Sequence, residues 1–208
     1  MDKLSSLIQK VLPLSATDST ALKPYFSSRR LRHGDCLVRL GQRTPVLALL
    51  ADGVLVEYGS RGEGQSAQDT VLRIYTDGAV VGDVANAAGG LPAERSFRAV
   101  GYQARAYVLE AEGLAAARRL GSWSRLERRL LTECHRDLNE HFTRWRTLDA
   151  RGRYRQVVRE RPELLEKVPL KILAAYLNVA PATLSRLRAA ARVEDGEGVD
   201  LSQAAASG

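Results

Sequence analysis

The stretch KILAAYLNVAPATLSRLR, residues 171–188, decides the fold of the C-terminal part of the chain. Its pattern is that of two short helices joined by a tight turn. Asn178 tolerates the backbone conformation of such a turn, and Pro181 fits the first position of a second helix, where no amide donor is needed. Leu184 and Leu187 then fall on the inner face of that helix. The segment therefore predicts a helix-turn-helix.

The second helix of this pair leaves polar side chains available on its outer face. A helix of this width fits the major groove of DNA and presents its N-terminal half to the base edges. An arginine there could bind the O6 and N7 acceptors of a guanine, and a threonine near the helix start could donate to a phosphate. An ordinary helical hairpin is the alternative interpretation. The candidate DNA contacts are Thr183, Ser185, Arg186, Arg188 and, on the first helix, Lys171.

Positive charge is concentrated around the same segment. The chain has 208 residues, with 31 Lys and Arg against 24 Asp and Glu, a net charge of +7 and an isoelectric point near 9.7. Residues 151–192 contain ten basic and three acidic residues, whereas residues 193–208 contain four acidic residues and no basic one. A generally basic proteome would spread the excess more evenly, so the clustering indicates a nucleic-acid-binding module.

The sequence between Arg29 and about Glu110 has a different residue pattern, in which short apolar runs alternate with glycine-containing turns. Strands this short, with turns this regular, predict an antiparallel barrel or sandwich. Two helices are expected before it, at residues 4–12 and 18–27, with Asp18 as the N-cap of the second. The expected strands are Val46–Leu50, Val54–Tyr58, Val71–Tyr75, Val80–Val81, Phe97–Val100 and Ala104–Leu109.

A long amphipathic helix is predicted over residues 122–148, because apolar residues recur at three- or four-residue steps for seven turns and Ser122 is a natural N-cap. A helix of ~40 Å is longer than one small barrel needs. The remaining apolar stripe favours a parallel dimer, with a helix lying wholly on its own domain as the alternative. A hinge is expected at 149–152. Helices at about 152–160, 162–166, 169–177 and 181–191 and a disordered tail should follow.

Several classes of protein are excluded by composition. Two cysteines cannot make a disulfide framework, which favours a reducing cytoplasm. No stretch approaches 18 uncharged apolar residues, so no membrane span is expected. The pairs His33/Cys36 and Cys134/His135 do not provide three ligands at metal spacing. We therefore expect neither a metal site nor a catalytic site.

The segment RPELLEKVP, residues 161–169, running into the helix pair, resembles the Crp/Fnr family of transcription regulators. HGDCLVRLGQ at 33–42 and ADGVLV at 51–56 are similar to the β-roll of that family. The resemblance covers about residues 5–191. It implies an α+β fold: an N-terminal antiparallel β-roll (a double-stranded β-helix, jelly-roll-like), a long dimerisation helix and a C-terminal helix-turn-helix domain with a short or missing wing.

The resemblance also implies how the chain is divided. A cyclic-nucleotide-binding-like sensor domain is expected at residues 1–121, the dimerisation helix at 122–149, the DNA-binding domain at 150–192 and the tail at 193–208. The implied function is that of a cytoplasmic regulator, not an enzyme, which binds a two-fold double-stranded DNA site as a homodimer and contacts RNA polymerase.

Two features of the helix-turn-helix domain depart from the family. Ala182 stands where members commonly carry a Glu that would accept from cytosine N4. No apolar hairpin follows Arg192. The alternative function is therefore an effector-sensing or protein-interaction module whose DNA-binding domain is degenerate.

The segment GDVANAAGGLPAERS, residues 82–96, is similar to the phosphate-binding cassette of the family. By this resemblance Gly82 forms the turn, and Arg95 and Ser96 bind a phosphate. Asp83 replaces the Glu that would bind a ribose hydroxyl, and it is one methylene shorter. The chemistry fits, because backbone amides, a hydroxyl and a guanidinium are the donors that capture an anion.

The adenine-contacting pair that the family carries on its long helix falls on Leu138 and Asn139. Asn139 can still hydrogen-bond a base, whereas Leu138 cannot. The resemblance thus implies a cyclic nucleotide, cAMP or cGMP, as effector. A different anionic or small effector and no effector at all stay open, the last with Arg95 paired to Asp83 or Glu94.

Overall fold

The computed structural model describes residues 2–12, 14–61, 68–83, 86–87 and 90–191, and the predicted tail at 193–208 lies outside them. The chain forms two compact units, which meet between Phe142 and Thr143. The first is built on an antiparallel sheet with helices at its ends, and the described part of the second is helical. The boundary falls inside one long helix.

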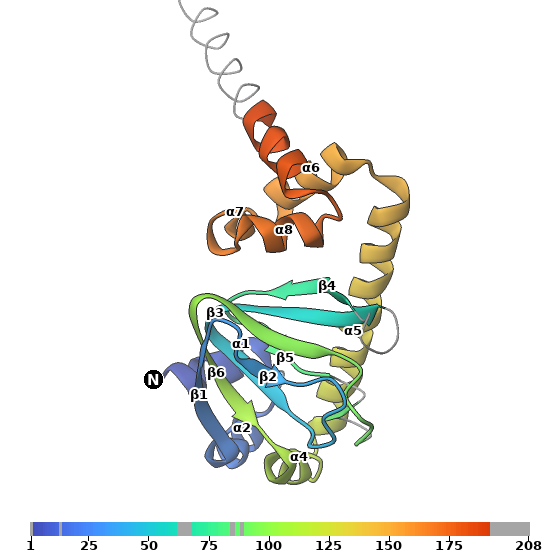
Figure 1. The fold of residues 1–208 in the computed structure, drawn as a ribbon. Helices are drawn as coiled ribbons and strands as arrows, with labels where there is room; N and C mark the ends of the chain where they lie inside the picture. Colours follow the sequence, from blue (N-terminus) through green and yellow to red (C-terminus); the bar gives the residue numbers. More distant parts are fainter. Residues whose placement is uncertain (1, 13, 62–67, 84–85, 88–89, 192–208) are drawn as a thin grey trace, which may run out of the picture. The chain divides into compact units, whose positions relative to one another are not determined.

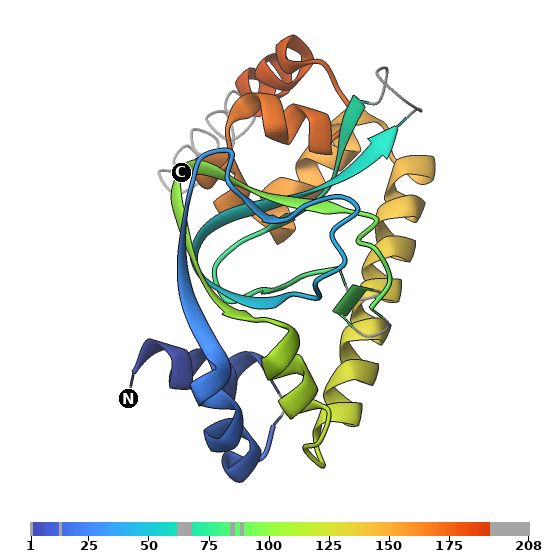
Figure 2. The same ribbon diagram turned by 60° about the horizontal axis from the view of Figure 1, so that its bottom comes forward.

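The sheet of the first unit has the strand order β1-β6-β3-β4, with β2 added to β6 and β5 added to β3. All of its pairings are antiparallel. The strands curve around a shared interior, which Figure 2 shows as a roll. Their bounds are β1 Phe26–Arg32, β2 Cys36–Val38, β3 Leu47–Arg61, β4 Gln68–Tyr75, β5 Val80–Val81 and β6 Ser96–Leu109.

Two long strands, β3 and β6, replace four of the predicted short ones. The prediction divided β3 at Gly53 and β6 near Gly101, where the backbone has positive φ but the strand continues. The pairing of the two strands shifts register on both sides of Asp52. A Cβ on Gly53 would lie 2.5 Å from the carbonyl oxygen of Gln103, so only glycine permits this close approach.

The helices of the first unit are α1 Lys3–Val11, α2 Ala16–Leu22, the 3-10 turn η1 Lys23–Tyr25, α4 Ala111–Ala117 and α5 Trp123–Thr147. Helices α2 and α4 lie at one end of the roll (Figure 1), and Figure 2 shows α1 at the same end. They share an apolar core with the first turns of α5, including Ile8, Leu22, Leu114 and Leu126, and a second core fills the roll itself.

The predicted role of Asp18 as an N-cap is wrong. Helix α2 begins earlier, and the Ser15 side chain accepts from the Asp18 amide at 3.0 Å. The Asp18 carboxylate instead accepts from the amide of Ser122 at 3.2 Å and from its hydroxyl. It thereby fixes the chain just before α5, and these hydrogen bonds lower the pKa of Asp18.

The second unit contains α6 Ala150–Glu160, α7 Glu163–Lys167, α8 Leu170–Tyr176 and a last helix over residues 181–191. These elements agree closely with the predicted ranges. The predicted hinge at 149–152 is too long, because Asp149 is already the N-cap of α6 and accepts from the Gly152 amide at 2.7 Å. Leu164, Leu173, Leu177 and Leu184 form the buried centre.

Candidate functional site

The segment that resembles a phosphate-binding cassette begins at a position that requires glycine. A Cβ on Gly82 would lie 2.5 Å from the carbonyl oxygen of Val46. The Asp83 side chain that follows is buried. Its Oδ1 accepts from the Asn86 amide at 3.1 Å and its Oδ2 from the Glu94 amide at 2.8 Å. Both carboxylate oxygens thus already close the loop on itself.

Asn86 locks this loop to a neighbouring one. Its side chain is fully buried, and its Nδ2 lies 3.1 Å from the carbonyl oxygen of Gln42, 3.3 Å from that of Arg43 and 2.6 Å from that of Leu91. Gln42 also accepts from the Ala93 amide at 2.9 Å. The two ends of the cassette are therefore held rigidly, while its middle, residues 84–85 and 88–89, lies outside the described part.

Arg95 lies beside an unexpected partner. Its Nε lies 3.8 Å from Oε1 of Glu57, while its Nη1 donates to the Glu94 carbonyl at 3.0 Å. Its side chain is 40% exposed. The interpretation without an effector paired Arg95 with the carboxylate of Asp83 or Glu94, whereas the contacting carboxylate belongs to strand β3.

Glu57 belongs to a group of interacting polar side chains, here called the Glu57 cluster: Glu57, Arg73, Tyr75, Arg95 and Asp137. Tyr75 donates to Glu57 at 2.7 Å, and Arg73 donates to the Tyr75 hydroxyl at 3.2 Å. Arg73 also lies 3.9 Å from Glu57 and 3.8 Å from Asp137 of α5. Burial, together with the nearby Glu57 carboxylate, raises the pKa of Tyr75 well above its ordinary value.

Sequence reasoning missed Glu57, Arg73, Tyr75 and Asp137. One signal was present, because Glu57 is a charged residue inside the apolar run Val54–Tyr58. A carboxylate in a buried strand needs a partner. Its partners come from strand β4, from the residue just before β6 and, through Arg73, from α5, so no local spacing reveals them.

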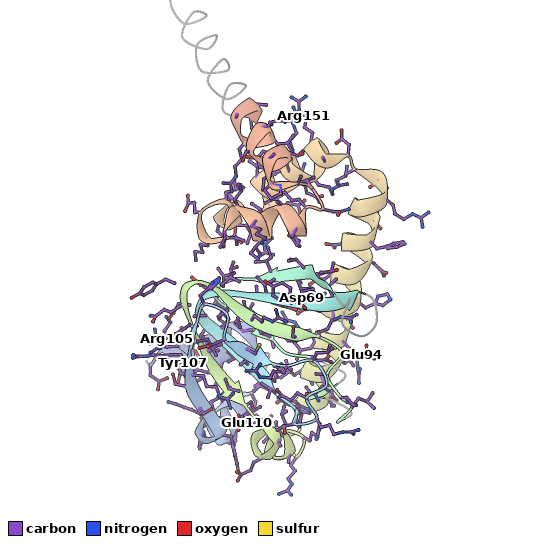
Figure 3. All side chains as sticks on the ribbon, viewed as in Figure 1. Asp69, Glu94, Arg105, Tyr107, Glu110 and Arg151 are labelled. Atoms are coloured by element: carbon purple, nitrogen blue, oxygen red, sulfur yellow. The ribbon has the colours of Figure 1, made fainter. Side chains whose placement is uncertain are left out.

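Ser96 and Asn139, the other predicted effector residues, have side-chain contacts with residues other than Arg95. Ser96 is buried, and its hydroxyl accepts from Nη2 of Arg98 at 3.4 Å. Arg98 in turn forms an ion pair with Asp69, which Figure 3 labels. Asn139 is exposed on α5, with its Nδ2 3.2 Å from a ring nitrogen of His135. The side chain of Leu138 lies outside the described part.

The turn between α8 and the last helix has the predicted geometry. Asn178 has a φ of 51°, a left-handed conformation that asparagine tolerates better than most residues. Its amide donates to the Ala175 carbonyl at 3.0 Å, and the Val179 amide donates to that of Ala174 at 2.9 Å. Leu184 is fully buried against this pair.

The candidate DNA contacts divide by exposure. Ser185, Arg186 and Lys171 are exposed, and within the described residues Arg186 has neither an ion pair nor a hydrogen-bond partner for its side chain. Thr183 and Arg188 are half-buried. Arg188 donates to the Leu165 carbonyl of α7 at 3.2 Å, so part of its guanidinium holds the unit together.

Helix α5 changes character along its length. Trp123 and Leu126 are buried in the core of the first unit, whereas Leu131 is 49% and Phe142 is 60% exposed. These two are eleven residues apart, or about three turns, and so lie on one face of the helix.

The described part of the chain contains neither a candidate metal site nor a candidate membrane span. Its His, Cys, Asp and Glu side chains form no group of three or more that could hold a metal ion. Within the same residues, no helix has the length and apolar character needed to cross a membrane.

No protein-family model and no curated protein matches the sequence. Solved structures do match, and 354 of their chains are similar to this one. The regulatory domain of Toxoplasma gondii PKA with cAMP has 22% identity and a TM-score of 0.52, covering 62% of this chain and 49% of that one. This chain thus spans about half of that structure.

Two bacterial proteins match over most of their length. The Catabolite Activator Protein of Thermus thermophilus has 21% identity and a TM-score of 0.53, with 91% of this chain and 87% of that one covered. The c-di-GMP responsive global regulator CLP of Xanthomonas campestris has 16% identity and a TM-score of 0.63, with 87% and 93% covered. At these identities the likeness establishes the fold alone, an antiparallel β-roll followed by a long helix and a helical C-terminal unit.

Proposed function

We propose that this chain is a transcription regulator of the Crp/Fnr type, which binds DNA through its second unit. The observation that carries the proposal is a basic helical unit in which the exposed Arg186 has no side-chain partner among the described residues, and which one long helix joins to a β-roll. One of the similar proteins, CLP, is a global regulator that links cell-cell signalling to virulence gene expression. The proposed division is a sensor at 1–121, a dimerisation helix at 122–149 and a DNA-binding domain at 150–192.

Arg186 is the proposed base-reading residue. Its neighbours on the exposed face, Ala182 and Ser185, are small, so the guanidinium can reach a guanine edge without obstruction. Thr183 and Lys171 are assigned to phosphates, which fix the register of the helix in the groove. Arg188 combines a phosphate contact with its bond to α7.

A homodimer is the proposed assembly. The exposed Leu131 and Phe142 supply apolar surface that α5 does not bury in its own unit. A second copy of α5 packed against this face would cover both side chains and place two DNA-binding units on a two-fold site. RNA polymerase is the further partner that the family resemblance implies.

A cyclic nucleotide is the proposed effector, with its phosphate at Arg95 and the cassette. The support is the glycine-dependent turn at Gly82, the rigid cassette ends and the half-exposed guanidinium. Asp83 and Ser96 already have internal partners, so Arg95 contributes most of the charge attraction. Asn139 is assigned to the base.

The alternative, a sensing or protein-interaction module with a degenerate DNA-binding domain, is favoured by Ala182. Selection of binding sites from random duplexes with the full-length chain separates the two functions. A regulator enriches a two-fold sequence with half-site centres about 10 bp apart. A library that is not enriched would reject the DNA-binding proposal and favour the alternative.

Titration calorimetry with cAMP and cGMP tests the effector. Binding that is lost in Arg95→Ala supports the cassette assignment. Binding that survives the substitution unchanged would place the ligand elsewhere, and absence of binding would favour another anion or none.

A further inference from the structure

Glu57 is a buried carboxylate that the proposed function does not use. Its side chain is 12% exposed, and it accepts one hydrogen bond, from Tyr75. Its nearest cations, Arg73 and Arg95, lie at 3.9 and 3.8 Å, beyond hydrogen-bond distance. Oε1, which faces Arg95, therefore accepts no hydrogen bond from the described residues. A carboxylate held this way is stabilised mainly by the charges around it.

The position of Glu57 is fixed by the register of the sheet. It pairs directly with Arg73 of β4 on one side and with Phe97 of β6 on the other. Arg95 immediately precedes β6, two residues ahead of Phe97, so the pairing of β3 with β6 brings the end of the cassette close to Glu57. The sheet thus places Glu57 beside the start of β6, and the Arg95 guanidinium approaches it from the segment just before that strand.

We propose that Glu57 is a specificity-determining residue: a built-in anion that occupies Arg95 and must be displaced before the phosphate of an effector can bind there. This inference rests on the proposed effector site. Two arginines of the Glu57 cluster are matched by two carboxylates, Glu57 and Asp137, so the cluster is neutral as it stands. A phosphate at Arg95 adds a negative charge beside a buried carboxylate, and the repulsion lowers its affinity.

The consequence is selection among anions. A phosphate alone gains little at Arg95, because it only exchanges one anion for another. A ligand that also contacts the roll or α5 through a sugar and a base can overcome the exchange. Glu57 therefore favours nucleotides over free phosphate.

Displacement of Glu57 would also affect an ion pair on α5, the one between Arg73 and Asp137. Arg73 lies between Glu57 and Asp137, at 3.9 and 3.8 Å. If Glu57 turns away, Arg73 keeps Asp137 as its one carboxylate neighbour in the Glu57 cluster. Binding at the cassette thus alters an ion pair on the long helix.

The test uses the full-length chain, with Glu57→Gln as the variant and Glu94→Gln as the matched control. Glu94 is exposed and adjacent to Arg95 in sequence, so the control removes an equal charge from the same region (Figure 3). The signal is the Nε–H resonance of Arg95, assigned by its loss in Arg95→Lys, during titration with inorganic phosphate. We expect Glu57→Gln to bind phosphate at least tenfold more tightly than the wild type, and Glu94→Gln to stay within twofold. Equal affinities in the two variants would overturn the proposal.

Titration of the same proteins with cAMP and cGMP separates this inference from the proposed function. Tighter nucleotide binding by Glu57→Gln supports both. Nucleotide binding that is equal in wild type and Glu57→Gln overturns the inference and leaves the effector proposal intact. A gain in phosphate binding without any nucleotide binding leaves the inference intact and rejects the cyclic nucleotide.

A measurement on the unmodified protein covers the case in which Glu57→Gln fails to fold. Saturation with cAMP, or with inorganic phosphate if cAMP does not bind, must shift the carboxyl carbon resonance of Glu57. A ligand that shifts the Arg95 signal and leaves that of Glu57 unchanged would overturn the proposal.

Discussion

The β-roll and the helical unit use arginine in opposite ways. In the first unit, Arg73 and Arg95 both lie within 4 Å of the buried Glu57. On the last helix, Arg186 is exposed and has no side-chain partner among the described residues. An arginine whose charge is matched inside the fold contributes to that fold. One that faces water between small residues is available to another molecule.

Salt concentration should have a large effect on DNA binding by the helical unit and a small effect on the stability of the roll. If a dimer neutralises roughly 6–10 phosphates, log K for DNA should fall against log salt with a slope of about −5 to −9. Between 50 and 200 mM salt, that is a loss of about 10³–10⁵ in affinity. Unfolding of the roll should change little over the same range, because buried charges are weakly screened. Fluorescence anisotropy and urea unfolding measure the two responses, and a DNA slope shallower than about −2 would contradict a backbone-tracking interface.

Loss of one arginine should destabilise one region and not the other. Arg73→Ala leaves Glu57 buried with a single, half-exposed cation near it, and should lower the free energy of unfolding by about 3 kcal/mol. Arg186→Ala removes an exposed side chain and should cost less than about 0.5 kcal/mol. Urea unfolding followed by tryptophan fluorescence, to which the buried Trp123 of the first unit contributes, measures both losses. If Arg73→Ala lowers the free energy of unfolding as little as Arg186→Ala does, the Glu57 cluster does not stabilise the roll.

Alkaline pH should affect the Glu57 cluster through Tyr75. Its pKa is raised in the folded chain by burial and by Glu57, so the unfolded chain releases this proton first. The stabilisation is complete below the unfolded pKa near 10 and is lost as pH rises toward the folded value, at up to about 1.4 kcal/mol per pH unit. Tyr75→Phe should reduce this fall in urea unfolding between pH 10 and 11. Identical pH profiles for variant and wild type would show that Tyr75 does not make this contribution.

Local patterns were sufficient to predict the second unit. Helical spacing, Pro181 and Asn178 act within a few residues, and the observed helices follow them closely. The roll was predicted as a class but not in detail. Edge strand β1 was missed because its sequence FSSRRLR is mostly polar and buries only Leu31.

In the candidate site of the roll, the sequence predicts individual residues but not the contact between Arg95 and Glu57. Gly82 and Arg95 could be identified from the cassette pattern, and the structure shows that Gly82 requires glycine and that Arg95 is partly exposed. The occupation of Arg95 by Glu57 depends on the pairing of β3 with β6, which places Glu57 beside Phe97 and so near the residue that precedes β6. Such contacts follow from sheet register, which a run of apolar residues does not specify.

The measurement that tests the central claim most directly is the affinity of Arg186→Ala for two duplexes, the selected site and random DNA. If Arg186 reads a base, the variant should lose ~1–3 kcal/mol, about 5- to 150-fold, on the selected site and far less on random DNA. Arg188→Ala, a phosphate contact, should weaken both duplexes by similar factors. Equal losses of Arg186→Ala on both duplexes, or no preference of the wild type for the selected site, would contradict the account.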